Sequence, residues 1–164
     1  MASKTISIAI ITLAQVLALS VWFAGTAALP AMLAAAEISR FAQAALTSSV
    51  QIGFVAGALA SAILSLPDRF DARHVFAAGA ALAAIANLLG LVTEPGSATM
   101  IACRALAGAS LALVYPVGMK LAASWAKGDA GLLVGSLVGA SALGSATPYA
   151  FNLFINATQW QAPF

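Results

Sequence analysis

The sequence has very few charges for its length. Of 164 residues, seven are Lys or Arg and five are Asp or Glu, so 7% are charged and 62% are hydrophobic. Soluble domains carry about 25% charged and about 45–50% apolar residues. So few charged side chains cannot cover the outside of a globule of this size in water. The composition therefore excludes an ordinary soluble protein and indicates that membrane lipid surrounds the chain.

Metal-ligating and redox side chains are equally scarce. Cys103 is the single cysteine and His74 the single histidine, so the chain cannot assemble a disulfide framework, a CxxC motif or an HExxH site. The net charge of +2 comes without a basic stripe that would follow a phosphate backbone. No nucleophile with a partner base and no paired membrane carboxylates are visible. We therefore expect no metal or other cofactor, no nucleic-acid partner and no enzymatic activity.

Long apolar runs fill most of the sequence. A membrane-spanning helix needs about 20 mainly apolar residues, and cutting the chain at its polar clusters leaves five such segments. They cover approximately residues 6–33, 44–66, 74–92, 98–122 and 131–154. The connections hold the charges, Gly or Pro expected where a helix leaves the hydrocarbon. The sequence therefore predicts an all-α fold, a polytopic membrane bundle of about five transmembrane helices in a single domain, residues 1–164.

The basic residues of the connections favour one orientation. With the N-terminus in the cytoplasm, one cation, Arg40, falls on the outer side and the others fall on the inner side. The inner ones are Lys4, Arg69, Arg73, Lys120 and Lys127. This distribution predicts a cytoplasmic N-terminus and places residue 164 on the periplasmic or external side. No Asp or Glu falls within a predicted span, so we do not expect a proton-coupling acid in these helices.

Small residues recur every four positions in two of the predicted spans. The second span has Ser49, Gly53, Gly57 and Ser61, and the fifth has Gly131, Gly135 and Gly139. In lipid, such grooves let helices approach closely. One interpretation is ordinary helix packing, and the other is a smooth surface on which two halves of a transporter rock. The pattern alone does not choose between them.

The stretch LSLPDRFDARHVF, residues 64–76, gathers five ionisable side chains between two apolar runs. It resembles the loop between the second and third helices of major facilitator superfamily transporters, whose signature is approximately G-x-x-x-D-R-x-G-R-K. Asp68, Arg69 and Arg73 match that signature. The positions that depart from it are Leu64, Asp71 and Ala72. The resemblance implies that the matching residues make charge contacts that gate the cytoplasmic side, and the alternative is a basic inner loop that only sets the topology.

Later parts of the chain extend the resemblance. CRALAGAS places Arg104 and Gly108 as in the family's R-x-x-x-G arrangement on its fourth helix. Residues 120–149 are similar to the family's fourth loop and Gly-rich fifth helix, where Gly144 and Pro148 stand without the consensus order of a Gly-Pro signature. We assign Gly108, Gly144 and Pro148, with the small-residue stripes, to helix packing or rocking. The terminal TQWQAPF is similar to the W-R-x-x-F segment before the family's sixth helix.

The resemblance covers nearly the whole chain but amounts to less than one six-helix half of a family fold that normally has twelve helices. It implies a fragment, the N-terminal portion of a transporter, in the inner (cytoplasmic) membrane of a bacterium. The implied partners are membrane lipid, a small-molecule solute and either the missing C-terminal helices or a partner subunit.

Two polar and aromatic stripes mark a candidate solute pathway. Gln15, Leu19, Trp22 and Thr26 share one face of the first span, and Arg104, Gly108, Leu111 and Tyr115 share one face of the fourth. The resemblance would place these two helices beside a central cavity. We predict that the stripes face each other and that the Arg104 guanidinium attracts an anionic or carbonyl-bearing solute. The alternatives are snorkelling or a structural hydrogen bond for Arg104, and packing for Trp22 and Tyr115.

The leading functional hypothesis is secondary active transport of a small solute by alternating access. Pro116 and Pro148 each remove a backbone hydrogen bond inside a predicted span. The resulting kinks would either serve as hinges or only shape the packing. The alternative hypothesis is a non-transporting accessory or assembly subunit with a transporter-like fold.

Overall fold

The computed structural model describes residues 4–155 and 160–164, without the side chains of residues 152–155. The helices are α1 (Lys4–Ala35), α2 (Arg40–Ile63), α3 (Leu66–Arg69), α4 (Ala72–Leu91), α5 (Ala98–Leu111), α6 (Tyr115–Ala123) and α7 (Ala130–Ile155). The described part of the chain contains no strand. Counting α5 and α6 together, five stretches in it are long and apolar enough to cross a membrane. The predicted all-α membrane bundle is confirmed.

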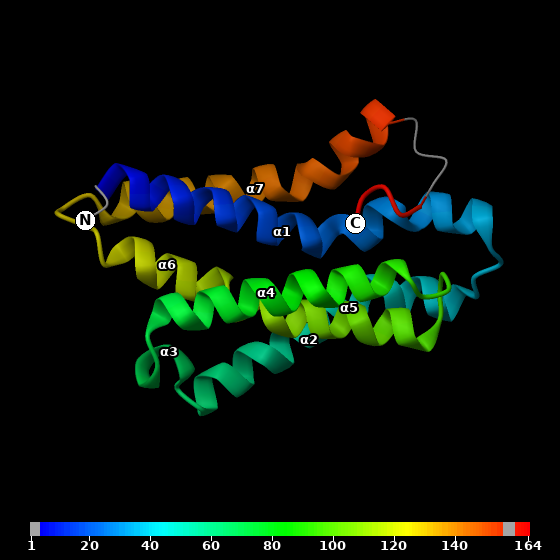
Figure 1. Cartoon of the computed structure of the whole chain (residues 1–164), viewed down its shortest axis with the longest axis horizontal. Coiled ribbons are helices and arrows are strands. Elements are labelled where there is room, and N and C mark those ends of the chain that lie inside the picture. Colours follow the sequence, from blue (N-terminus) through cyan, green and yellow to red (C-terminus); the bar gives the residue numbers. More distant parts are fainter. Residues whose placement is uncertain (1–3, 156–159) are drawn as a thin grey trace.

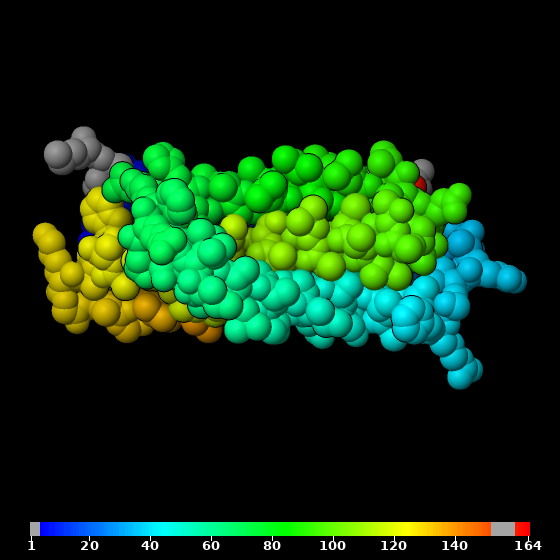
Figure 2. Space-filling model, turned by 90° about the horizontal axis from the view of Figure 1, so that it is seen from below, coloured from blue at the N-terminus to red at the C-terminus, as the bar shows by residue number. Residues whose placement is uncertain are grey.

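The helices run lengthwise in an elongated bundle (Figure 1). α1 packs mainly against α7, whereas α2 and α4 both pack against α5, and Figure 2 shows α4, α5 and α2 side by side along one face. The start of α1, α3 and the α6–α7 connection lie at one end of the bundle, called here the Lys4 end (Figure 1). The cations that the sequence analysis assigns to the cytoplasm all belong to this end. Which side of the membrane it faces stays a prediction.

The contact between α2 and α5 is so close that glycine is required on both helices. A Cβ added to Gly53 of α2 would lie 2.7 Å from the carbonyl carbon of Ala105, and Gly57 repeats this contact one turn further along. From the other side, a Cβ added to Gly108 of α5 would lie 2.8 Å from the carbonyl carbon of Val50. Backbone therefore packs directly on backbone, which is how helices gain van der Waals contact in lipid.

The glycine stripe of α7 is arranged differently. Cβ atoms added to Gly135 and Gly139 would meet nothing within 4 Å, so this face of α7 is open among the described residues. Gly144 instead faces α1, where an added Cβ would lie 2.6 Å from the carbonyl oxygen of Val16. Pro148 is buried, and α7 continues across it.

The fourth predicted span consists of two helices. α5 ends at Leu111, and α6 begins at Tyr115, one residue before Pro116. Pro116 has no N–H to donate to the carbonyl of Ala112, so the ladder of α-helical hydrogen bonds is interrupted there. The N–H of Val114 donates to the Leu111 carbonyl at 3.0 Å, which makes a tighter turn than an α-helix. The kink expected at Pro116 takes the form of this break, residues 112–114.

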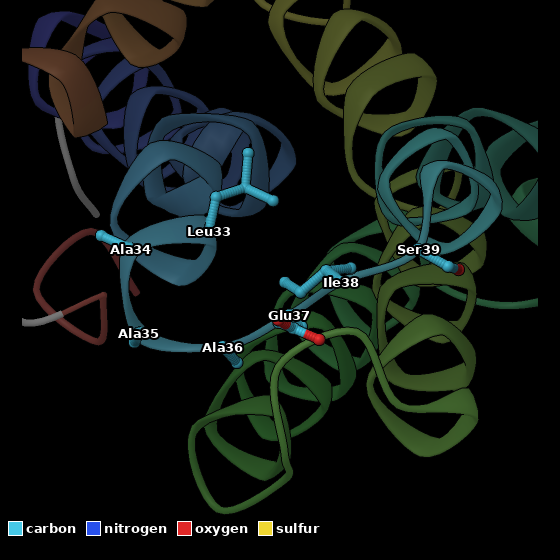
Figure 3. Close-up of a pocket in the computed structure, with 7 residues that line it drawn as sticks. All are labelled: Leu33, Ala34, Ala35, Ala36, Glu37, Ile38 and Ser39. Carbon is cyan, nitrogen blue, oxygen red and sulfur yellow. The ribbon is translucent and has the colours of Figure 1, made fainter.

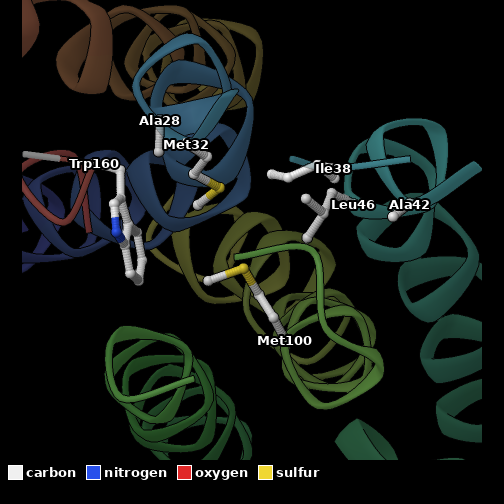
Figure 4. Packing of buried hydrophobic residues seen from close by; sticks show 7 residues of the cluster. All are labelled: Ala28, Met32, Ile38, Ala42, Leu46, Met100 and Trp160. Atoms are coloured by element: carbon white, nitrogen blue, oxygen red, sulfur yellow. The ribbon is translucent and has the colours of Figure 1, made fainter. Parts of the chain in front are cut away.

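A buried apolar cluster joins the helices at the end opposite Lys4. Met32 of α1 and Met100 of α5 are fully buried and extend toward each other, with Leu46 of α2 nearby (Figure 4). Trp160 packs beside the α1 part of this cluster. The cluster therefore fixes α1, α2 and α5 to one another at this end.

The terminal segment 160–164 lies against the bundle. The rings of Trp160 and Phe164 meet edge-on, with centroids 6.1 Å apart, and the side-chain amide of Asn87 donates to the Phe164 carbonyl at 2.9 Å. Asn87 thus bonds α4 to the terminal segment. Thr158 and Gln159, which begin the TQWQAPF stretch, lie outside the described residues.

The α2–α5 contact generates the first prediction. We expect Gly53→Ala to lower the free energy of unfolding by about 1–3 kcal/mol, because the added methyl group overpacks a backbone contact. Gly135→Ala is the matched control, since its Cβ meets open space. Thermal unfolding of the purified protein in detergent measures both. Equal melting temperatures for the two variants would contradict the close α2–α5 contact.

Candidate functional site

A cavity of about 390 Å³ lies between α1, α2, α7 and the break that separates α5 from α6. It is lined by Leu19, Trp22, Phe23, Phe54, Leu111, Tyr115, Ser141 and Ser145. Small-molecule sites typically occupy about 300–1,000 Å³ and are mainly apolar with a few polar groups. Each lining residue stands near the middle of its span, so the cavity lies at mid-depth in the bundle.

The two sequence stripes meet at this cavity in part. Leu19 and Trp22 come from the stripe of the first span, and Leu111 and Tyr115 come from that of the fourth. Leu111 ends α5 and Tyr115 begins α6, so the break in the helix places both side chains on the cavity.

Aromatic rings dominate one wall of the cavity. The ring of Trp22 meets that of Phe54 edge-on, with centroids 5.1 Å apart, and is tilted against that of Phe23 at 6.5 Å. On the α7 side, the hydroxyl of Ser141 donates to the Leu137 carbonyl at 3.0 Å. The hydroxyl of Ser145 likewise donates within its own helix. Both serine oxygens therefore keep lone pairs that can accept a hydrogen bond.

Arg104 is buried and engaged with the backbone of α1. Its side chain is 2% exposed, and it donates to the carbonyl of Val21 at 2.8 Å and also to the carbonyl of Trp22. Gly25 makes room for the guanidinium, since an added Cβ would lie 2.7 Å from Nε of Arg104. Arg104 is absent from the cavity lining. The guanidinium fastens α5 to α1 beside Trp22, and contact with a solute would require it to leave these carbonyls.

The other two residues of the first-span stripe lie away from the cavity lining. Gln15 is fully buried, and neither amide atom has a hydrogen-bond partner among the described residues. It faces Gly118 of α6, where an added Cβ would lie 2.7 Å from Oε1 of Gln15. Thr26 is half-buried.

The comparison with protein families decides the affiliation of this bundle. A family model described as the Major Facilitator Superfamily matches residues 11–164. The chain belongs to the Major Facilitator Superfamily. The comparison with curated proteins and that with solved structures find no match. The match confirms the family that the sequence resembles, and it makes the chain an integral membrane protein of a transporter family.

The loop between α2 and α4, which resembles the superfamily signature, makes one ion pair with the rest of the described chain. Nζ of Lys120, in the last turn of α6, lies 2.6 Å from Oδ1 of Asp68 and 2.7 Å from the carbonyl oxygen of Pro67. Asp68 and Lys120 are largely exposed, and such pairs contribute about 0–1 kcal/mol. The side chains of Arg69 and Arg73 have no hydrogen bond or ion pair with the residues that the structure describes. The loop therefore links α3 to α6 through Asp68.

Asp71 departs from the superfamily signature and caps a helix instead. Its side chain accepts a hydrogen bond from the backbone N–H of Arg73 at 2.8 Å, at the start of α4. An Asp just before an apolar helical run is a common N-cap. The capping role was therefore predictable from the sequence, although the sequence analysis treated Asp71 only as a departure from the superfamily signature.

A second ion pair closes the Lys4 end. Nζ of Lys4 lies 2.6 Å from Oδ2 of Asp129, whose other oxygen accepts from the backbone N–H of Lys127 at 2.9 Å. These contacts, the Lys4 hydrogen bond above all, hold the pKa of Asp129 below its usual value. The pair connects the first turn of α1 to the α6–α7 connection.

A wider hollow of about 760 Å³ has a different character. Its lining, Leu33–Ser39, follows a single stretch of chain from the end of α1 to the start of α2 (Figure 3). No other part of the described chain contributes a side chain to the lining, and Glu37 is the one ionisable residue of this stretch. Functional groups do not converge there, so we assign no site to it.

Sequence reasoning missed four of the lining residues. Phe23, Phe54, Ser141 and Ser145 reach the cavity from three helices. The four-residue spacing of the two serines on one face of α7 was an available signal. Phe54 follows a packing glycine in an apolar run, and nothing local distinguishes it from a lipid-facing side chain.

The burial of Arg104 generates the second prediction. We expect Arg104→Ala to lower the free energy of unfolding by about 1–2 kcal/mol, because two hydrogen bonds between α5 and α1 are lost. Arg69→Ala is the control, since Arg69 is exposed. Thermal unfolding in detergent measures both changes. A variant at 104 as stable as the variant at 69 would contradict the role of the guanidinium in joining these helices.

The Asp129 carboxylate generates a pH-dependent prediction. Its folded pKa lies below the unfolded value, so its stabilisation is present above the unfolded pKa and is lost as the pH falls through the folded pKa. We expect Asp129→Asn to melt below the wild type at neutral pH. The difference should vanish in acid, where both side chains are neutral. A difference that does not shrink as the pH falls below the unfolded pKa of about 3.9 would contradict this assignment.

Proposed function

We propose that the chain is the N-terminal part of a secondary transporter, which moves a small solute by alternating access in the inner membrane of a bacterium. The observation that carries the proposal is the mid-depth cavity, where α1, α2, the α5–α6 break and α7 converge. Transporters of several folds bind their solutes at mid-depth beside discontinuous helices.

The surrounding contacts fit a bundle that moves as a unit. The glycine contact between α2 and α5 and the Arg104 hydrogen bonds hold the helices together, whereas the face around Gly135 and Gly139 is open. We assign that open face to packing or rocking against further helices or a partner subunit. The ion pair of Asp68 with Lys120, together with Arg69 and Arg73, would then belong to the cytoplasmic gate, and residue 164 would lie on the opposite side of the membrane.

Cysteine labelling tests whether water reaches the cavity, as a solute route requires. Cys103 is the single native cysteine, so Cys103→Ala gives a cysteine-free background. In that background we expect Leu19→Cys and Ser145→Cys to react at least tenfold faster than Leu143→Cys with a membrane-impermeant methanethiosulfonate. The reason is that the reactive thiolate forms in water and not in an apolar environment.

Leu143→Cys is the matched control because Leu143 stands on the opposite side of α7 from Ser145, and its side chain is exposed on the bundle surface. The labelling is measured on the protein in membranes by mass spectrometry. Equal, slow labelling at all three positions would contradict an aqueous solute route and favour a subunit that does not transport.

A further inference from the structure

Among the residues that the structure describes, no charged side chain lines the cavity. Its eight lining residues include one ionisable group, the phenol of Tyr115, and the remainder are apolar side chains and two serines. A charged solute at this depth would lose its hydration without gaining a counter-charge, which is costly in a membrane interior. The lining therefore favours an uncharged solute.

Arg104, the cation bonded to the backbone of the cavity residue Trp22, is already engaged. The guanidinium of Arg104 donates to the carbonyls of Val21 and Trp22 and is packed on Gly25. No Asp or Glu occurs in α1, α2, α5, α6 or α7. Neither an anion nor a cation thus finds an opposite charge among the described side chains that line the cavity.

The aromatic wall and the serine oxygens define complementary features of the solute. Trp22 and Phe54 supply ring faces and edges, against which a flat ring packs in offset or edge-on geometry. Ser141 and Ser145 have committed their hydroxyl protons to carbonyls of α7, so their oxygens are acceptors. A bound molecule satisfies them best by donating a hydrogen bond.

We propose that the solute of this cavity is an uncharged aromatic molecule that carries a hydrogen-bond donor, such as a phenolic hydroxyl or a ring N–H. The proposal rests on the proposed transport function and specifies its substrate class. It replaces the anionic or carbonyl-bearing solute expected from the sequence, because Arg104 serves as a positioning residue for the Trp22 turn.

Protection of a cavity thiol tests the substrate class. The reporter is Leu19→Cys in the Cys103→Ala background, which leaves both serines and all the cavity aromatics in place. Labelling by the methanethiosulfonate is measured against increasing concentrations of five probes. They are naphthalen-2-ol, 2-methoxynaphthalene, 2-naphthoate, 2-naphthylmethylammonium and glucose, which vary charge, donor and aromaticity separately.

We expect naphthalen-2-ol to half-protect the thiol at a concentration at least tenfold below those of the charged probes and glucose, and at least threefold below that of 2-methoxynaphthalene. Stronger protection by the naphthoate, the ammonium or glucose overturns the proposal. Equal protection by the methoxy compound overturns it as well, because the donor would then be irrelevant. An unreactive reporter thiol instead contradicts the aqueous route, so the two failures are distinguishable.

Second variants separate the cavity from general partition into lipid. We expect Trp22→Ala, added to the reporter, to raise the half-protecting concentration of naphthalen-2-ol at least tenfold, whereas Trp125→Ala leaves it unchanged. Trp125 is the matched control because it lies at the α6–α7 connection, outside the cavity lining. Ser145→Ala should remove the advantage of naphthalen-2-ol over the methoxy compound. Identical effects of the two tryptophan variants would overturn the assignment of this cavity.

Discussion

In lipid hydrocarbon the hydrophobic effect does not drive one helix against another. The association of these helices therefore depends on the close contacts that α5 makes with its neighbours. On one side, Gly108 lets the backbone of α5 meet that of α2 directly. On another, Arg104 extends to α1 and bonds two of its carbonyls. A third neighbour, α4, approaches through Gly79, where an added Cβ would lie 2.9 Å from the Ser110 carbonyl oxygen. The contacts of α5 with α2 and α4 require glycine, which has no side chain, and its contact with α1 requires the buried guanidinium of Arg104.

The same helix creates the cavity by ending early. Pro116 cannot continue the hydrogen-bond ladder of α5, and the tighter turn at 112–114 redirects the chain into α6. Leu111 and Tyr115 flank that turn and line the cavity together with Trp22. Arg104, which lies about two helical turns before Leu111 on α5, bonds the carbonyl of Trp22 on α1. Residues of the same helix therefore both hold the bundle together and shape the cavity.

Local sequence features predicted the helices well because they depend on length and composition. The five apolar runs match the observed spans to within a few residues, apart from the second, where Ser65 in the left-handed conformation (φ 49°) separates α2 from α3. Pro116 likewise predicted the interruption of the fourth span. The superfamily motifs were recognisable because their residue types and spacing survive in the chain. The cavity was only half predicted, since Phe54 and the serines come from helices whose rotation about their axes is set by packing.

Composition and hydropathy by themselves determined that this protein is a membrane helical bundle, because the cost of placing charge in hydrocarbon constrains every residue independently of its neighbours. The superfamily was implied by the resemblance of its motifs. The tertiary structure alone decided what the buried polar residues do. The sequence left open whether Arg104 binds a solute, snorkels or makes a structural hydrogen bond, and in the structure it bonds the α1 backbone, where Gly25 leaves space. The two small-residue stripes, which have the same four-residue spacing, also differ in their contacts. The stripe of α2 packs against the backbone of α5, whereas the glycines at 131, 135 and 139 of α7 face open space. These differences depend on which helix packs against each stripe and how closely, and a single sequence does not contain that information.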